Sequence, residues 1–222
     1  MFQSASNVSE LIIDSTVDFS NVTDSGLMFY GVGNNTASGA ILTLNSLNFS
    51  SSTSFDRMFS YVKSSNTLDL STISSVNVTN FNGMFQGSKL NGLDISGMNM
   101  SSATNISNMF SSSNGGNVTS IDLSTKNLSN LGQNGFSEVF NFNKDVTSIL
   151  LPDLPSGLDF YQTFYYAENL VCLNKLDTTG AYRTYNLFNG CSSLTAPDSS
   201  TQSQLTDDAN GGLDWTNPNS CP

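Results

Sequence analysis

Three aspartates occupy equivalent places in this sequence and could act together. Asp69, Asp94 and Asp122 stand at the centre of Leu-Asp-Leu, Leu-Asp-Ile and Ile-Asp-Leu. If these triplets are stacked strands, their apolar residues share one face and the carboxylates form a row on the other. Carboxylates so close raise one another's pKa or recruit a cation, so the row could bind a divalent ion or a cationic ligand. We favour the alternative that each carboxylate accepts hydrogen bonds within a turn, because a serine follows each aspartate two residues later.

The residue types needed for most hydrolytic chemistry are missing. The chain has no histidine, which excludes Ser-His-Asp and Cys-His nucleophiles and nearly all zinc sites. Two carboxylates about 5 to 10 Å apart in a cleft could still hydrolyse a glycoside. Such a site also needs a basic partner, and the seven lysines and arginines do not cluster in the sequence. We therefore expect no enzymatic activity, no metal site and no cofactor.

The last third of the chain has more aromatic residues than a narrow coil can bury. Phe160, Phe164 and Phe188 fall at positions expected in the core. Tyr and Trp dominate the hot spots of binding surfaces. The other aromatic side chains are therefore candidates for an exposed binding patch: Tyr161, Tyr165, Tyr166, Tyr182, Tyr185 and Trp215. The alternative is an end cap, in which residues 211–222 cover the last coil.

The three cysteines, Cys172, Cys191 and Cys221, fit neither a zinc spacing nor a disulfide framework. Two of them can still pair. Cys221 is the best candidate for a bridge, because a tail folded over the last coil needs an anchor. The alternative is that all three are small buried side chains.

Composition limits the partners of this 222-residue chain. Only 11% of its residues are charged, and its net charge of −11 leaves no basic stripe for phosphate contacts. No run of eighteen apolar residues is long enough to cross a bilayer, and the start, MFQSASNVSE, has no secretory signal. We expect neither nucleic-acid binding nor membrane insertion.

An apolar residue followed by Phe recurs along the chain as an internal repeat. Successive Phe residues of these pairs are 24 to 30 residues apart, the range in which one supersecondary unit stacks on the next. The pairs are Met1-Phe2, Met28-Phe29, Met58-Phe59, Met84-Phe85, Met109-Phe110, Val139-Phe140, Thr163-Phe164 and Leu187-Phe188. The spacing predicts a solenoid of about eight coils, an architecture that commonly presents an extended binding surface.

Each copy of the repeat has two parts. Apolar residues that alternate with polar ones, such as Leu68 and Leu70, predict a short parallel strand with one buried face. A threonine, which is a good helix N-cap, lies six residues before the Phe in four copies: Thr23, Thr53, Thr79 and Thr104. The segment from Thr to Phe is therefore predicted to be a short helical or 3₁₀ turn. The expected fold class is an α+β repeat solenoid with one such strand and one such turn per coil.

The order Met-Phe, a small or Cys position, Leu-x-x-Leu-x-Leu-Ser and Asn-Val-Thr resembles the BspA-like, leucine-rich repeats of bacterial surface proteins. The stretch LFNGCSSLT from Leu187 to Thr195 is the best match, and the resemblance covers residues 1 to about 196. It implies a right-handed leucine-rich-repeat-like array. It also implies a surface-exposed or secreted protein, of a kind usually classed as adhesins or as of unknown function, and similar arrays occur in phage-encoded proteins. The sequence departs from the pattern at residues 140–188, where the Met of the pair is lost.

The two ends of the chain differ. The chain opens in mid-repeat without a polar cap, so we expect it to be a segment of a longer protein or to pack on another subunit through residues 1–14. Residues 1–198 are assigned to the solenoid and residues 199–222 to a C-terminal capping segment. Within this segment, residues 205–222 are expected to lie across the last coil near Phe188 and Leu194.

These features predict a non-catalytic recognition or adhesion solenoid, extracellular, on a cell surface or on a virion. It would bind a protein or glycan of a host or neighbouring cell. The alternative is a structural subunit or segment of an extracellular fibre or phage-borne virion, which stacks through its N-terminal end. Nine Asn-x-Ser/Thr sequons either carry glycans or belong to the turns of the repeat.

Overall fold

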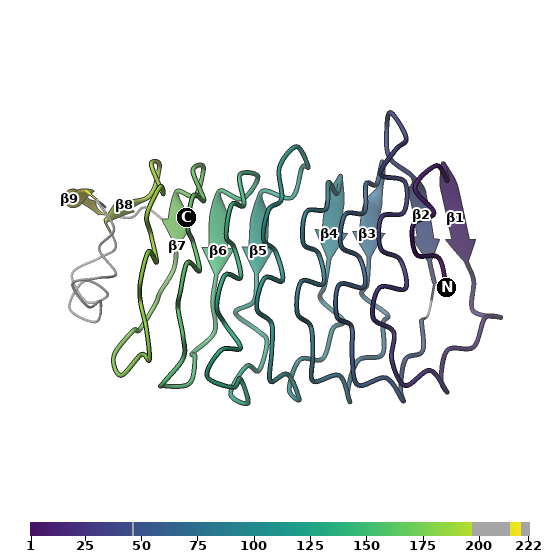
Figure 1. The fold of residues 1–222 in the computed structure, drawn as a ribbon, viewed down its shortest axis with the longest axis horizontal. Helices are drawn as coiled ribbons and strands as arrows, with labels where there is room; N and C mark the ends of the chain where they lie inside the picture. Colours follow the sequence, from purple (N-terminus) through teal and green to yellow (C-terminus); the bar gives the residue numbers. More distant parts are fainter. Residues whose placement is uncertain (46, 197–213, 219–222) are drawn as a thin grey trace.

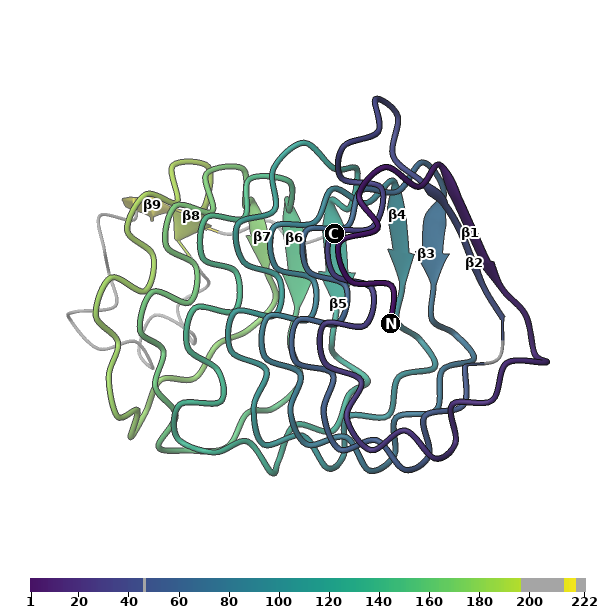
Figure 2. The same ribbon diagram turned by 45° about the vertical axis from the view of Figure 1, so that its right-hand side comes forward.

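The computed structural model, which describes residues 1–45, 47–196 and 214–218, is a parallel β-solenoid of about six turns (Figure 1). Short strands lie in a row along one side, and turn segments return the chain on the other side (Figure 2). The strands are β1 (Glu10–Ile13), β2 (Ile41–Leu44), β3 (Thr67–Asp69), β4 (Gly92–Asp94), β5 (Ser120–Asp122), β6 (Ser148–Leu150), β7 (Cys172–Leu173), β8 (Thr195–Ala196) and β9 (Asp214–Pro218). The expected eight coils are more than the turns observed.

The strands pair in parallel with their equivalents in neighbouring coils, but the sheet is not continuous. Its strand orders are β1-β2, β3-β4, β5-β6-β7 and β8-β9. Between β2 and β3 the side chain of Asn66 replaces the ladder: its Oδ1 accepts from the Leu42 amide at 2.9 Å and its Nδ2 donates to the Leu42 carbonyl at 2.8 Å. Between β4 and β5 no strand ladder joins the described residues, and the ammonium of Lys126 donates instead to carbonyls that follow β4. The sheet is therefore interrupted at this junction.

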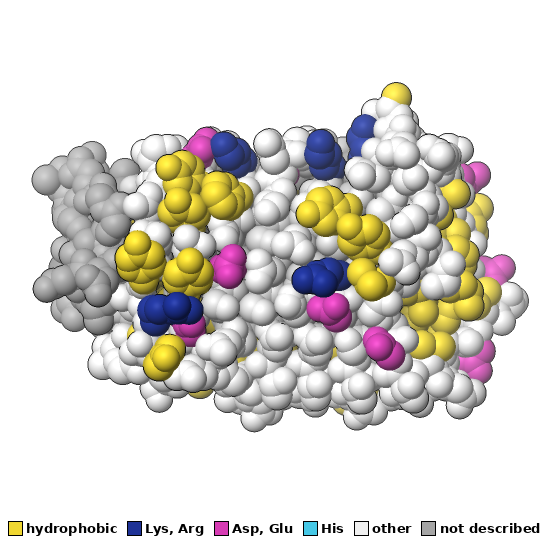
Figure 3. All heavy atoms as spheres, viewed as in Figure 1, with side chains coloured by type: hydrophobic (Ala, Val, Ile, Leu, Met, Phe, Trp, Pro, Cys, Tyr) yellow, Lys and Arg dark blue, Asp and Glu magenta, His cyan; other side chains and the backbone are white. Residues whose placement is uncertain are grey.

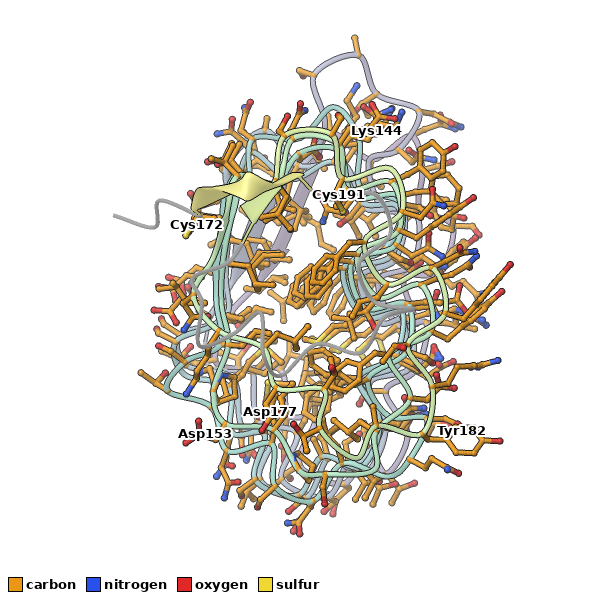
Figure 4. The ribbon with its side chains drawn as sticks, turned by 90° about the vertical axis from the view of Figure 1, so that its left-hand side faces the viewer. Lys144, Asp153, Cys172, Asp177, Tyr182 and Cys191 are labelled. Atoms are coloured by element: carbon orange, nitrogen blue, oxygen red, sulfur yellow. The ribbon has the colours of Figure 1, made fainter. Side chains whose placement is uncertain are left out.

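The Phe residues of the repeat form one column along the solenoid, as the spacing predicts. Rings of consecutive coils are stacked with centroids 5.0 to 5.9 Å apart and interplanar angles of 5 to 13°. The column contains Phe2, Phe29, Phe59, Phe85, Phe110, Phe140, Phe164 and Phe188. All except the half-buried Phe2 are buried, and Figure 4 looks along the molecule through this core. Each coil thus supplies one ring, which its neighbours on both sides cover.

The apolar strand residues line the other side of the same core. The same alternation that predicted burial of Leu68 and Leu70 applies to the other coils, and the strand residues that are buried are Leu42, Leu44, Leu68, Leu70, Ile95, Ile121 and Leu123. Leu93 is the exception and is only half-buried. It belongs to β4, which pairs with β3 on one side but with no strand on the side of the interruption.

The predicted helical turn is wrong, because the described residues contain no helix. We call the segment around each Phe of the column, from the predicted Thr cap to about three residues after the Phe, the Phe turn. Along it, every second amide donates to a carbonyl of the next coil and not to a carbonyl of its own coil. The Phe85 amide donates to the Met109 carbonyl at 2.9 Å, while the Met84 amide closes a turn on the Phe81 carbonyl at 3.1 Å. Residues two before and two after the Phe have left-handed backbones, as at Gly83 (φ +59°) and Gly87 (φ +65°). A left-handed residue every fourth position prevents an α-helix from propagating.

The predicted N-caps are wrong as well. Instead of capping, the Thr79 hydroxyl donates to the Thr53 carbonyl of the preceding coil at 3.3 Å, and the Thr79 amide donates to the same oxygen at 3.0 Å. The Thr53 hydroxyl approaches the Thr23 carbonyl in the same way, and that of Thr104 approaches Thr79. The turn is closed by the next residue, since Asn80 Oδ1 accepts from the Asn82 amide at 3.0 Å. Asp24, Ser54, Asn105 and Asp159 do the same in other coils.

Several asparagines of the sequons serve the backbone. Asn48, Asn99, Asn105 and Asn127 each accept from the amide two residues later. These four triplets are thus part of the turn chemistry of the repeat.

The chain ends are only partly described. At the start, the Phe2 amide donates to the Met28 carbonyl at 2.9 Å, so the first residues already follow the ladder of the Phe turns. The predicted capping segment lies largely outside the described residues, apart from β9, which pairs with β8. In the described part of the chain, no helix is long and apolar enough to cross a membrane.

Candidate functional site

The candidate site lies on the turn face, the surface that the Phe turns make opposite the strands. Exposed hydrophobic side chains gather there over the C-terminal coils (Figure 3), and Figure 4 shows Tyr182 projecting on the side away from the strands. We call the aromatic side chains of this group the aromatic patch: the exposed Phe142, Tyr166, Tyr182 and Tyr185 and the half-buried Tyr161 and Tyr165. Tyr182 and Tyr185 are the most exposed, at 64% and 59%.

One half of the aromatic patch is a cluster of three rings. Phe142 stacks on Tyr166, with centroids 5.4 Å apart, and meets Tyr165 edge-on at 5.2 Å. Tyr166 in turn covers the backbone of Gly190 in the next coil, where a Cβ atom would lie 2.8 Å from the ring. These contacts hold the rings in place although Phe142 and Tyr166 are 43% and 37% exposed. The cluster is therefore a fixed surface feature.

The other half is organised around an ion pair. The carboxylate of Asp159, which is 1% exposed, accepts from both Nε and Nη2 of Arg183, at 3.0 and 2.5 Å. The Arg183 guanidinium lies 4.1 Å from the centre of the Tyr161 ring, and Tyr161 stacks on Tyr185 at 6.1 Å. The Asp159 hydrogen bond raises the pKa of Arg183, so the cation on this surface is permanent.

The structure brings together five of the predicted binding tyrosines and adds two residues that the sequence did not single out, Phe142 and Arg183. Phe142 stands two residues after its Phe, the place that Tyr61 and Tyr166 occupy in other coils, so a stricter alignment of the copies could have found it. No comparable signal marks Arg183, because its role depends on Asp159 in the preceding coil. The last candidate, Trp215, lies in β9, and its side chain is outside the described residues.

The predicted row of aspartates is interrupted. Asp69 and Asp94 are register partners in β3 and β4, but Asp122 belongs to a different sheet. Each carboxylate accepts from the amide of the serine two residues later, at 2.8 to 2.9 Å, which is the turn-acid arrangement we favoured. The hydrogen bonds from Ser71 lower the pKa of Asp69. Among the described residues, no group of three or more acidic or Cys side chains could hold a metal ion.

A groove follows the interruption between β4 and β5, with Asp94 and Asp122 along it and Lys126 at one end. Lys126 is 8% exposed, and its ammonium donates to the carbonyls of Ile95, Ser96 and Met98 at 2.8, 2.9 and 3.1 Å. Burial lowers the pKa of Lys126, and the charges of Asp94 and Asp122 partly oppose this shift. The three carbonyls occupy the three N–H groups of the ammonium, so Lys126 replaces strand hydrogen bonds and is not free to act as an acid.

The cysteines take two different states. Cys172 is disulfide-bonded, so the alternative of three unpaired cysteines is wrong. Cys221, the predicted candidate for a bridge, lies outside the described residues. Cys191 is a free, buried thiol whose Sγ donates to the Phe164 carbonyl at 2.9 Å. Burial raises the pKa of the Cys191 thiol to about 12.

The stacked coils and repeated Phe turns define this molecule as a repeat protein of the solenoid class. A family model described as "Mycoplasma protein of unknown function, DUF285" matches residues 1–122, more than half of the chain, and the chain belongs to this repeat-containing family. No curated protein and no solved structure matches the chain. The aromatic patch, at residues 142–185, lies beyond the matched residues.

Proposed function

We propose that this protein is a non-catalytic recognition solenoid, an adhesin of a cell surface or virion that binds a protein or glycan of a neighbouring or host cell. The observation that carries the proposal is the aromatic patch. It combines rings fixed by inter-coil contacts with a permanent cation, Arg183. Exposed Tyr and Arg in a fixed arrangement are the residues that contribute most to binding hot spots. The resemblance to BspA-like surface repeats supports the same function.

A binding experiment tests this proposal. The fluorescently labelled chain is applied to cultured animal cells and to an immobilised glycan array, together with the double variant Tyr182→Ser, Tyr185→Ser. We expect saturable binding that the double variant loses by about tenfold or more, because two hot-spot side chains are removed. The matched control is Tyr61→Ser, which removes a 41% exposed tyrosine of the turn face far along the chain. Equal binding by the double variant, or no binding to any surface, would contradict the proposal.

The absence of catalysis is part of the proposal. The groove beside β4 contains two carboxylates and a lysine, the combination that a glycosidase would need. However, each carboxylate accepts hydrogen bonds within its own turn, and all three N–H groups of Lys126 are used by backbone carbonyls. Incubation with polysaccharide substrates should release no reducing sugar. Turnover that disappears in Asp94→Asn or Asp122→Asn would show that the groove is an active site.

A second candidate function is that of a structural subunit. Ile12 of β1 and Ile41 of β2 are 60% and 44% exposed on the outer surface of the first two strands. Exposed apolar side chains beside a strand edge favour association with another strand or coil. Light scattering over a concentration series tests this function: a fibre subunit should self-associate, and Ile12→Ser should reduce the association. A monomer at all concentrations would leave recognition as the better proposal.

A further inference from the structure

A second groove, away from the aromatic patch, has the features of an anion site. It has a volume of about 200 Å³ and lies at the corner where the chain enters the strands. Its lining residues are Ser38, Lys63, Ser64, Ser65, Lys89, Leu90, Asn91, Gly115, Gly116 and Asn117. Two of these ten residues are lysines and none is acidic, in a chain that has 18 acidic and 7 basic residues. The lining of the groove is therefore positively charged, in contrast to the chain as a whole, although the Asp145 carboxylate lies behind one wall.

The two lysines lie side by side on the floor of the groove. Lys63 and Lys89 are partners in a parallel β-bridge between consecutive coils, so their side chains leave the backbone in equivalent positions. Like charges directly opposite each other on adjacent strands are destabilising. The structure relieves this repulsion on one side only, because Lys63 Nζ donates to the carbonyls of Thr36 and Ala37 at 2.8 and 2.6 Å. Lys89 is exposed and its ammonium has no partner among the described residues, so it is available to an anion.

The walls of the groove are fixed before any ligand arrives. One wall is the loop at residues 36–38, which Lys63 holds through the contacts above. The other is the loop at residues 115–117, where the Asp145 carboxylate accepts from the amides of Gly115 and Gly116 at 2.7 and 3.0 Å. The Asn117 amide donates to the Leu90 carbonyl at 2.8 Å, and its side chain donates to Asn91 Oδ1 at 2.7 Å. A preformed site binds without the entropic loss of ordering its loops.

We propose that this groove binds the anionic group of an acidic saccharide, with Lys89 as the charged contact. The Ser and Asn side chains around the lysine supply hydroxyl and amide groups that suit sugar hydroxyls. Leu90 is the only large apolar residue of the lining and no aromatic ring borders it, which disfavours a nucleotide base. The volume lies below the range of about 300 to 1,000 Å³ typical of sites for drug-sized ligands, so it suits one sugar unit. This proposal does not rest on the aromatic patch.

Titrations followed by NMR of the backbone amides test the proposal on the whole chain. The probes are methyl glucuronide, the neutral methyl glucoside and sodium sulfate, all at constant ionic strength. We expect the glucuronide to give saturable shifts at Asn91, Gly115, Gly116 and Asn117, with both other probes about tenfold weaker or worse. Lys89→Gln should weaken glucuronide binding by about tenfold or more, since a hydrogen bond to a charged group is lost. Lys89→Arg should largely restore it.

The control variant is Lys175→Gln, which removes an exposed lysine paired with Asp153 and should bind the glucuronide normally. If sulfate binds as tightly as the glucuronide, the groove binds anions in general and does not recognise a saccharide. If the neutral glucoside binds as tightly as the glucuronide, Lys89 does not select for the negative charge of the ligand. Either result, an unchanged Lys89→Gln variant, or no shift in the groove overturns the proposal. None of these outcomes bears on the aromatic patch, which is tested with different variants.

Discussion

Tyr166 and Gly190 form a contact between consecutive coils: a Cβ atom at Gly190 would lie 2.8 Å from Cγ of Tyr166. Tyr61 and Gly87 make the same contact near the other end, where a Cβ atom would lie 2.7 Å from Cε1 of the ring. In both pairs the tyrosine stands two residues after its Phe, and the glycine occupies the same place one coil later. On the turn face, a tyrosine ring in one coil thus lies where the next coil has a glycine, because a side chain at that position would clash with the ring.

Replacing Gly190 by Ala should displace the Tyr166 ring and open the cluster with Phe142. Gly190 has a left-handed backbone (φ +84°), so alanine adds about 1 to 2 kcal/mol of backbone strain to the clash with the ring. Gly157→Ala is the matched control, because Gly157 has φ +78° but nothing within 4 Å of the added Cβ. Thermal unfolding should show a larger loss for Gly190→Ala than for Gly157→Ala. Equal losses would mean that the ring contact contributes nothing beyond backbone strain.

Removing one ring from the Phe column should be strongly destabilising. Phe85 is 1% exposed and stacks between Phe59 and Phe110, so Phe85→Ala should lower the free energy of unfolding by about 3 to 5 kcal/mol through the cavity it leaves. Phe142→Ala serves as the control, because Phe142 is 43% exposed and leaves no buried cavity. Denaturant titration measures both. A loss for Phe85→Ala no larger than that for Phe142→Ala would mean that the column is not the main source of stability.

Replacing Lys126 should lower the stability of the protein, although lysine side chains usually lie on the surface and contribute little to it. In Lys126→Met the carbonyls of Ile95, Ser96 and Met98 lose their donor, and an unsatisfied buried group costs about 1 to 3 kcal/mol. We expect a loss of about 2 to 4 kcal/mol in urea unfolding, allowing for water reaching part of the site. Lys175→Met, at an exposed ion pair, should change stability by less than about 0.5 kcal/mol. Near-wild-type stability of Lys126→Met would show that water replaces the ammonium at no cost.

The Cys191 thiol should make stability fall at alkaline pH. Burial raises its pKa from 9.0 in the unfolded chain to about 12 in the folded one, so above pH 9 the unfolded chain releases a proton that the folded chain keeps. The stability from the protonated thiol is complete below pH 9 and is lost as the pH rises from 9 to 12. Comparing wild type with Cys191→Ala between pH 8 and 11 isolates this effect. Native Cys191 should also resist Ellman's reagent at pH 8 until the chain unfolds, and immediate labelling would contradict its burial.

The periodicity predicted the parts of the fold that depend on burial. The Phe column and the strand residues recur in register, and an apolar side chain at a repeated position has the same neighbours in each coil. The turn geometry could not be predicted in this way. The Thr-to-Phe segment has the local composition of a helix start, but its amides bond to the next coil, and no local pattern reports a partner about 25 residues away.

The candidate site was predictable only in part, for similar reasons. Tyr182 and Tyr185 stood out by type, whereas the ion pair of Arg183 with Asp159 joins residues 24 apart and needed the structure. The interruption after β4 left no trace in the strand spacing. β5 begins 28 residues after the start of β4, and β6 begins 28 residues after β5, yet only the second pair is joined by a strand ladder.

The interruption between β4 and β5 also gives the array a mechanical asymmetry. On the turn face the ladder passes this point unbroken, as the Phe110 amide donates to the Val139 carbonyl at 2.9 Å. On the strand side no strand ladder crosses it within the described residues, and the hydrogen bonds of Asn117 and Lys126 to the preceding coil take its place. A rod with fewer hydrogen bonds along one edge bends most easily about the other edge, so this junction should bend more easily than the coils that a strand ladder joins. Flexing at this point would change the curvature of the molecule and the angle between its regular coils and its aromatic ones, while the Phe stacking stays intact.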